Sequence, residues 1–215
     1  MIVSTCGLIL RTRPLTETSV IVHWLTADVG RIATVAKGAR RPKSPFAGKL
    51  DLFFEADFSF QRSRRSDLHT LREVSLRGTH PALREELGRL EQAAYAAALI
   101  EQTTEVETPL PEIYGLLSGF LDFIAGGMAM PRNLFAFELK LLRLLGLEPD
   151  LPETRLPEDA RVLVNALLET KWDGLANLQA TAAQARALNQ FLHGFLIYHL
   201  GKFPPNRTQA LSAPS

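Results

Sequence analysis

An alternation of apolar and polar residues marks the stretch Phe54-Glu55-Ala56-Asp57-Phe58-Ser59-Phe60-Gln61. Successive side chains of a β-strand point to opposite faces of the sheet, so this period of two predicts a strand that buries one face. The three phenylalanines and Ala56 share that face. Residues 53–61 are therefore expected to form a half-buried strand.

Four more stretches before residue 78 are rich in β-branched and aromatic residues and are separated by turn-forming residues. They are Ile2–Leu10, Ser19–Thr26, Arg31–Ala36 and His69–Arg77. Asp28-Val29-Gly30 favours a tight connection between the second and the third. Five short strands predict a small closed barrel. The five-stranded OB-fold is the natural candidate, although an SH3-like barrel has the same periodicity.

Helical periodicity replaces the strand pattern after Pro81, a residue that suits a first helical turn. Apolar residues at steps of three and four predict one buried helix face, made of Leu83, Leu87, Leu90, Ala94 and Ala97. Proline and glycine then mark the limits of further helices. These are expected from Pro111 to Gly126, from Pro131 to Gly146, near residues 158–170 and near residues 181–200, where Thr181 and Gln184 fit a capping box.

The predicted fold class is therefore α+β, with two domains. An N-terminal OB-fold barrel is expected at residues 1–79, and an all-α bundle at residues 80–215. Three prolines indicate a connector at about residues 147–157 within the bundle.

The net charge of +1 hides an uneven distribution. Residues 1–80 hold 13 Lys and Arg against seven Asp and Glu, whereas residues 81–215 hold 11 against 16. A basic module joined to an acidic one predicts an anionic partner for the first. Ordinary solvated surface charge is the alternative.

Three clusters of cations fall between the predicted strands. The largest lies between Asp28 and Asp51, where six cations occur without an acid; Gly38 and Pro42 favour a loop there. In an OB-fold the other two clusters would lie on the loops that commonly frame the nucleic-acid groove. The sequence thus predicts phosphate binding, with solubilising surface charge as the alternative. The candidate residues are Lys37, Arg40, Arg41 and Lys43 in the first cluster, Arg11 and Arg13 after the first strand, and Arg62, Arg64 and Arg65 after the fourth.

Base stacking would need exposed aromatic side chains, and two residues are candidates. Trp24 lies in the middle of a predicted strand and is expected in the core. Phe46, beside the basic loop, is therefore the better candidate.

Catalytic and metal-binding motifs are absent from the sequence. It has no glycine-rich phosphate loop, paired-histidine helix or nucleophile elbow. Its single cysteine, Cys6, excludes an intramolecular disulfide and a cysteine-based zinc site. We expect no enzyme activity, metal or cofactor. No apolar run approaches the length of a membrane span and no secretory signal is present, so we expect a cytoplasmic protein associated with the nucleoid.

Three blocks of the sequence resemble the bacterial recombination-mediator family RecO. They are Arg11-Thr12-Arg13-Pro14-Leu15-Thr16-Glu17-Thr18-Ser19, Thr26-Ala27-Asp28-Val29-Gly30-Arg31 and Val35-Ala36-Lys37-Gly38-Ala39-Arg40-Arg41. Weaker similarity covers Phe137–Leu147, which resembles the family's central helix, and Tyr198–Lys202, which resembles its closing helix.

The resemblance implies an OB-fold followed by a helical domain. It also implies DNA repair by recombination: binding single- and double-stranded DNA, annealing complementary strands, and helping to load RecA onto strands coated by the single-stranded-DNA-binding protein, SSB. RecR is the implied partner. By position, the implied DNA contacts are Lys37, Arg40 and Arg41, with Arg11 and Arg13 as neighbours.

The resemblance further implies that the helical domain receives the acidic C-terminal tail of SSB in an apolar pocket rimmed by cations. Candidates for that rim are Arg132, Lys140 and Arg143. The alternative for each is the exposed face of an ordinary helix.

The sequence departs from the family in one respect. Many members carry four cysteines that bind zinc just after the central helix, whereas residues 146–157 contain none. We therefore expect no zinc. Two other functions remain open: a generic OB-fold module for single-stranded nucleic acid, and an enzyme whose site assembles from residues distant in sequence.

Overall fold

The computed structural model describes residues 1–212. Its strands are β1 (Ile2–Pro14), β2 (Val20–Thr26), β3 (Gly30–Ala36), β4 (Glu55–Gln61) and β5 (Leu68–Gly78). Its helices are α1 (Leu87–Thr103), α2 (Pro111–Ala125), α3 (Pro131–Leu144), α4 (Glu158–Glu169), α5 (Trp172–Leu175), α6 (Ala182–Leu200) and α7 (Arg207–Leu211), with 3-10 turns η1 (Pro81–Arg84) and η2 (Leu151–Glu153). No helix in the described part of the chain is long and apolar enough to span a membrane.

Two compact units make up the chain, and each is described by itself. The first consists of Met1–His80 and Thr104–Ser118, and the second of Pro81–Thr103 and the residues from Gly119 onward. The predicted division between residues 79 and 80 lies one residue before the end of the stretch Met1–His80. The sequence did not predict that residues 104–118 go with the barrel.

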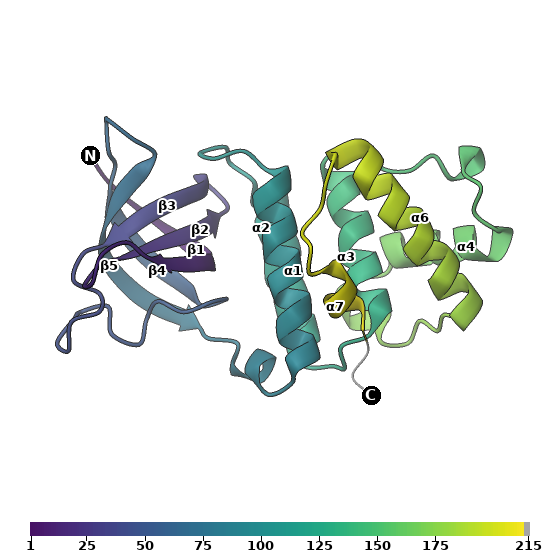
Figure 1. The fold of residues 1–215 in the computed structure, drawn as a ribbon, viewed down its shortest axis with the longest axis horizontal. Coiled ribbons are helices and arrows are strands. Elements are labelled where there is room, and N and C mark those ends of the chain that lie inside the picture. The colour runs from purple at the N-terminus through teal and green to yellow at the C-terminus, as the bar shows by residue number, and fades with distance from the viewer. Residues whose placement is uncertain (213–215) are drawn as a thin grey trace. The chain divides into compact units, whose positions relative to one another are not determined.

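The five strands of the first unit close into a barrel in the order β1-β2-β3-β5-β4 (Figure 1). All neighbouring strands are antiparallel except β3 and β5, which are parallel. A five-stranded barrel that closes in this order is an OB-fold. The predicted α+β class and the OB-fold barrel are confirmed.

The barrel core forms from the alternation that the sequence showed. Phe58 and Phe60 are buried in it, and the ring of Trp24 stacks on Phe58 with centroids 4.0 Å apart. The indole N–H of Trp24 donates to Thr34 Oγ1 at 2.9 Å, so its polar atom is satisfied. The core position of Trp24 is confirmed. Phe46 is also buried in this core, so its prediction as an exposed stacking residue is wrong.

The first strand extends further than predicted. It continues past Leu10 because Arg11, Thr12 and Arg13 pair with residues of β2 after a bulge between Ile9 and Arg11. Arg11 and Arg13 therefore lie in β1 and not in the loop that follows it.

Residues 104–118 pack on the barrel through contacts that begin at β3. Gly30 has a φ of +79°, and a Cβ at this position would meet the carbonyl oxygen of Thr108 at 1.8 Å, so only glycine fits. Arg31 Nε donates to Thr104 Oγ1 at 2.7 Å. The hydroxyl of Tyr114 donates to Glu55 Oε1 at 2.6 Å.

The second unit is helical, with α3, α4 and α6 burying leucine, valine and alanine side chains against one another. The predicted capping box is present: Thr181 Oγ1 accepts from the Gln184 N–H at 3.2 Å, and Gln184 Oε1 accepts from the Thr181 N–H at 2.9 Å. The predicted buried face is correct only in part, because Leu83 and Ala97 are buried but Leu87 is 69% exposed. The face that is buried includes Gln92, Tyr95 and Leu99.

Candidate nucleic-acid interface

The basic loop, Lys37–Lys43, is a series of tight turns that leaves β3. The backbone N–H of Arg41 donates to the carbonyl of Gly38 at 3.0 Å, and Gly38 has a φ of +71°, which favours glycine. Phe46 follows the loop and anchors it in the barrel core. The four cationic side chains all remain exposed: Lys37, Arg40, Arg41 and Lys43.

Strand pairing brings the basic loop to the same end of the barrel as Arg11 and Arg13. Val20, the first residue of β2, pairs with both Pro14 of β1 and Ala36 of β3. The backbone N–H of Arg40 donates to the carbonyl of Thr18 at 3.0 Å, which ties the basic loop to the turn between β1 and β2. We call the resulting group of exposed cations the basic end: Arg11, Arg13, Lys37, Arg40, Arg41 and Lys43.

The third predicted cluster lies elsewhere on the barrel. It occupies the loop between β4 and β5, and β5 begins at Leu68, which pairs in parallel with Ala33 in the middle of β3. This loop therefore lies toward the opposite end of β3 from the basic loop. Arg64 and Arg65 are exposed, whereas Arg62 is half-buried and its Nη2 lies 3.7 Å from Glu107 Oε2.

His23 lies next to Arg11 of the basic end, and the sequence did not single it out as a site residue. It faces outward from β2, directly opposite Arg11. Its burial, and then the charges of Arg11, Arg13 and Arg31, lower the pKa of His23 to about 4. The imidazole is therefore neutral near pH 7, because burial and then the neighbouring arginines disfavour its charged form. The strand alternation could have indicated it: Trp24 was expected to point into the core, so its neighbour His23 points outward.

Stacking of bases has no platform on the barrel. In the first unit, all of which the structure describes, no aromatic side chain is exposed. Trp24 and Phe46, the two candidates, are both in the core.

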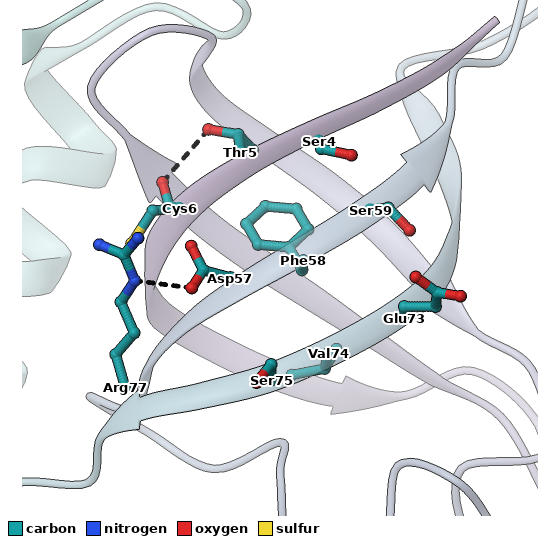
Figure 2. A pocket seen from close by; sticks show the side chains of 10 residues that line it. All are labelled: Ser4, Thr5, Cys6, Asp57, Phe58, Ser59, Glu73, Val74, Ser75 and Arg77. Carbon is teal, nitrogen blue, oxygen red and sulfur yellow. Dashed lines mark hydrogen bonds and ion pairs between the residues drawn. The ribbon is translucent and has the colours of Figure 1, made fainter.

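A hollow of about 690 Å³ on the barrel is formed by β1, β4 and β5 (Figure 2). Small polar side chains line it, and Arg77 Nε points toward Asp57 Oδ2 at 2.8 Å (Figure 2). Glu73 adds a second acid, so the hollow does not favour a polyanion. Burial raises the pKa of the Cys6 thiol at its edge, which disfavours the thiolate that a nucleophile needs. This hollow contains none of the residues predicted to bind nucleic acid.

A second hollow, of about 630 Å³, lies on the helical unit and has aromatic walls. The rings of Phe123 and Trp172 stack with centroids 5.8 Å apart. Lys140 Nζ lies 5.7 Å from the centroid of Trp172, and Lys171 is exposed at the rim. The hollow also contains two acids, Asp122 and Asp173.

Of the three residues predicted for a cationic rim, only Lys140 lines this hollow. Its ammonium donates to the carbonyls of Leu168 at 2.6 Å and Thr170 at 2.9 Å, and burial lowers its pKa. Arg143 instead bonds to Glu148 at 2.6 and 2.9 Å and to Glu169 at 2.8 Å. Arg132 donates to the carbonyl of Ala176 at 3.2 Å.

Residues 146–157, for which the family resemblance raised the question of a zinc site, are held by other contacts. Arg161 Nε donates to the carbonyl of Leu156 at 2.9 Å, and Leu156 is buried in the helical core. Among residues 1–212 no three His, Cys, Asp or Glu side chains come together as a metal site requires. The residues of this segment do not fit a zinc ion, whose structural sites are built from Cys and His.

Comparison with known proteins gives two family matches. Residues 1–80 match the model described as "Recombination protein O N terminal", and residues 84–154 match "Recombination protein O C terminal". The two matches cover the barrel and the helices from α1 to α3.

Similar curated proteins carry the name "DNA repair protein RecO". The one from Rhodopirellula baltica is 35% identical over 143 residues, which are 66% of this chain and 53% of that protein. The one from Anaeromyxobacter sp. (strain K) is 36% identical over 149 residues, 69% of this chain and 59% of that protein. The one from Bacillus pumilus is 31% identical over 153 residues, 71% of this chain and 59% of that protein.

This chain thus spans 53% to 59% of the length of these three relatives. The matches fall on the same residues as the OB-fold barrel and the first helices of the second unit. The chain belongs to the Recombination protein O family, RecO.

Proposed function

We propose that this chain acts in DNA repair by recombination: it binds single- and double-stranded DNA, anneals complementary strands, and helps to load RecA onto strands coated by SSB. The observation that carries the proposal is the basic end. Two segments separated in sequence bring six exposed cations to one end of an OB-fold barrel. The name shared by the relatives, DNA repair protein RecO, supports the same role.

Annealing follows from the electrostatics of this surface. Two DNA strands repel each other, and a protein that neutralises phosphates on both lowers that repulsion. The basic end and the exposed pair Arg64 and Arg65 lie toward opposite ends of β3. Groups of cations at separate places on one barrel can neutralise the phosphates of two strands at once.

Partner binding is proposed for the helical unit, in line with a division of labour between residues 1–79 and 80–215. The aromatic walls of this hollow, Phe123 and Trp172, suit a peptide that ends in phenylalanine. Lys140 and Lys171 offer cations to the acidic side chains of such a peptide, opposed by the acids Asp122 and Asp173. We propose this hollow as the site of the SSB tail. RecR is the second partner that we expect.

Annealing of complementary oligonucleotides without ATP tests the proposal, first with bare strands and then with SSB-coated strands, across a salt series. We expect acceleration at low salt that fades as salt rises, because phosphate contacts weaken with salt. Acceleration on SSB-coated strands supports the mediator role. Retention of single strands with annealing slowed at every salt concentration contradicts it and indicates a generic single-strand-binding module.

A further inference from the structure

One row of residues crosses the outer face of the barrel. Arg11 of β1 pairs with His23 of β2, His23 pairs with Ala33 of β3, and Ala33 pairs with Leu68 of β5. Neighbouring strands lie about 4.8 Å apart, so the row is about 14 Å long. These residues point away from the barrel core, since Trp24, next to His23 in the chain, points into it.

The row connects two of the cationic clusters. At one end Arg11 is accompanied by Arg13, two residues further along β1. At the other end Leu68 follows the loop that carries the exposed Arg64 and Arg65. His23 occupies the middle, and the small side chain of Ala33 lies beside it.

We propose that a DNA strand crosses the barrel along this row, with a phosphate next to His23, and that DNA binding is coupled to uptake of one proton by His23. This inference rests on the proposed DNA binding and deepens it. It adds His23 to the contact surface and makes the affinity depend on pH.

The direction of the coupling follows from the charges around His23. In the free protein, burial and the three neighbouring arginines lower the pKa of His23 to about 4. A phosphate beside the imidazole favours its protonated form and raises this pKa in the complex. Between the two pKa values the complex holds more protons than the free protein, so affinity rises as pH falls through that window. Above the pKa of the complex, affinity does not depend on His23 protonation.

Acids next to His23 do not offer a competing explanation for such coupling. β1, β2 and β3 contain no Asp or Glu, and the charged residues that face His23 from β1 and β3 are arginines. On the segment after α1, Glu107 Oε1 lies 2.7 Å from His69 Nε2, and Glu105 is exposed. Asp67, beside Leu68, is an exposed acid at the far end of the row.

The test is the pH dependence of binding to fluorescently labelled oligo(dT), whose bases do not titrate between about pH 5 and about pH 8, at constant ionic strength. The unchanged protein is compared with His23→Gln and with His193→Gln, a matched change at an exposed histidine on α6. With a His23 pKa of about 6 in the complex, near the ordinary histidine value, DNA binding is about tenfold stronger at pH 5 than at pH 7.5. His193→Gln keeps this dependence and His23→Gln loses it.

The outcomes separate this inference from the proposed function. If the unchanged protein shows no salt-dependent DNA binding at pH 7.5, the proposed function fails. If it binds but His23→Gln has the same pH profile, only the proton coupling is overturned. Should His23→Gln not fold, NMR titration of His23 in the unchanged protein decides. A pKa that rises when oligo(dT) is added supports the inference, and an unchanged pKa contradicts it.

Discussion

Arg207 and Glu138 form a buried bidentate ion pair in the helical unit. Arg207 Nε lies 2.7 Å from Glu138 Oε1, and Nη2 lies 2.9 Å from Oε2. The two side chains are 4% and 0% exposed. Tyr95 donates to Glu138 at 2.6 Å and Arg207 donates to Asn189 at 2.7 Å. The network therefore ties α7 to α1, α3 and α6.

Replacement of Arg207 by alanine should lower the free energy of unfolding by about 3 to 5 kcal/mol, because it leaves the carboxylate of Glu138 buried without its partner. Urea denaturation followed by the helical circular dichroism signal measures the change. Arg186→Ala, at an exposed position on α6, is the control and should change the free energy by less than about 0.5 kcal/mol. Equal effects of the two variants would show that the buried pair does not stabilise the unit.

Lys140→Gln should weaken binding of a labelled acidic peptide that ends in phenylalanine by about tenfold or more, because it removes a partly buried charge at the aromatic hollow. DNA affinity should not change. Arg143→Ala is the matched control and should have little effect on the peptide, since Arg143 already bonds to Glu148 and Glu169. Loss of both peptide and DNA binding in Lys140→Gln would contradict separate sites on the two units.

Metal analysis of the purified protein should find less than one zinc per chain. The only cysteine, Cys6, lies in β1, and residues 146–157 contain no cysteine. A chelator should therefore leave the melting temperature unchanged. One tightly held zinc per chain, with a lower melting temperature after chelation, would contradict this interpretation of the segment.

The sequence predicted the barrel well because local patterns determine it. The alternation at Phe58 and Phe60 is the direct sign of a strand with one buried face, and the capping box at Thr181 is a local contact between residues three apart. The basic loop was also predictable, since Gly38 and Pro42 exclude regular structure there. All three features depend on neighbours in the chain.

Features that depend on tertiary partners were not predictable in this way. Gln92 was not expected on the buried face of α1, but it donates to the carbonyls of Met130 and Ala210 at 3.0 and 3.3 Å and is buried. Leu87, expected in the core, is exposed. Phe46 is buried because its loop folds back over the barrel, which no local pattern of a loop indicates.

The measurement that tests the DNA-binding surface most directly is the salt dependence of single-stranded DNA affinity for the double variant Arg40→Ala/Arg41→Ala. The slope of log affinity against log salt should fall by about 0.7 for each phosphate that the variant no longer neutralises. Arg72→Ala, an exposed arginine of β5 outside the three clusters, is the control and should keep the slope. We predict that the double variant binds more weakly and with a slope smaller by about 1.4. An affinity and a slope that both equal those of the unchanged protein would contradict the assignment of the basic end as the DNA site.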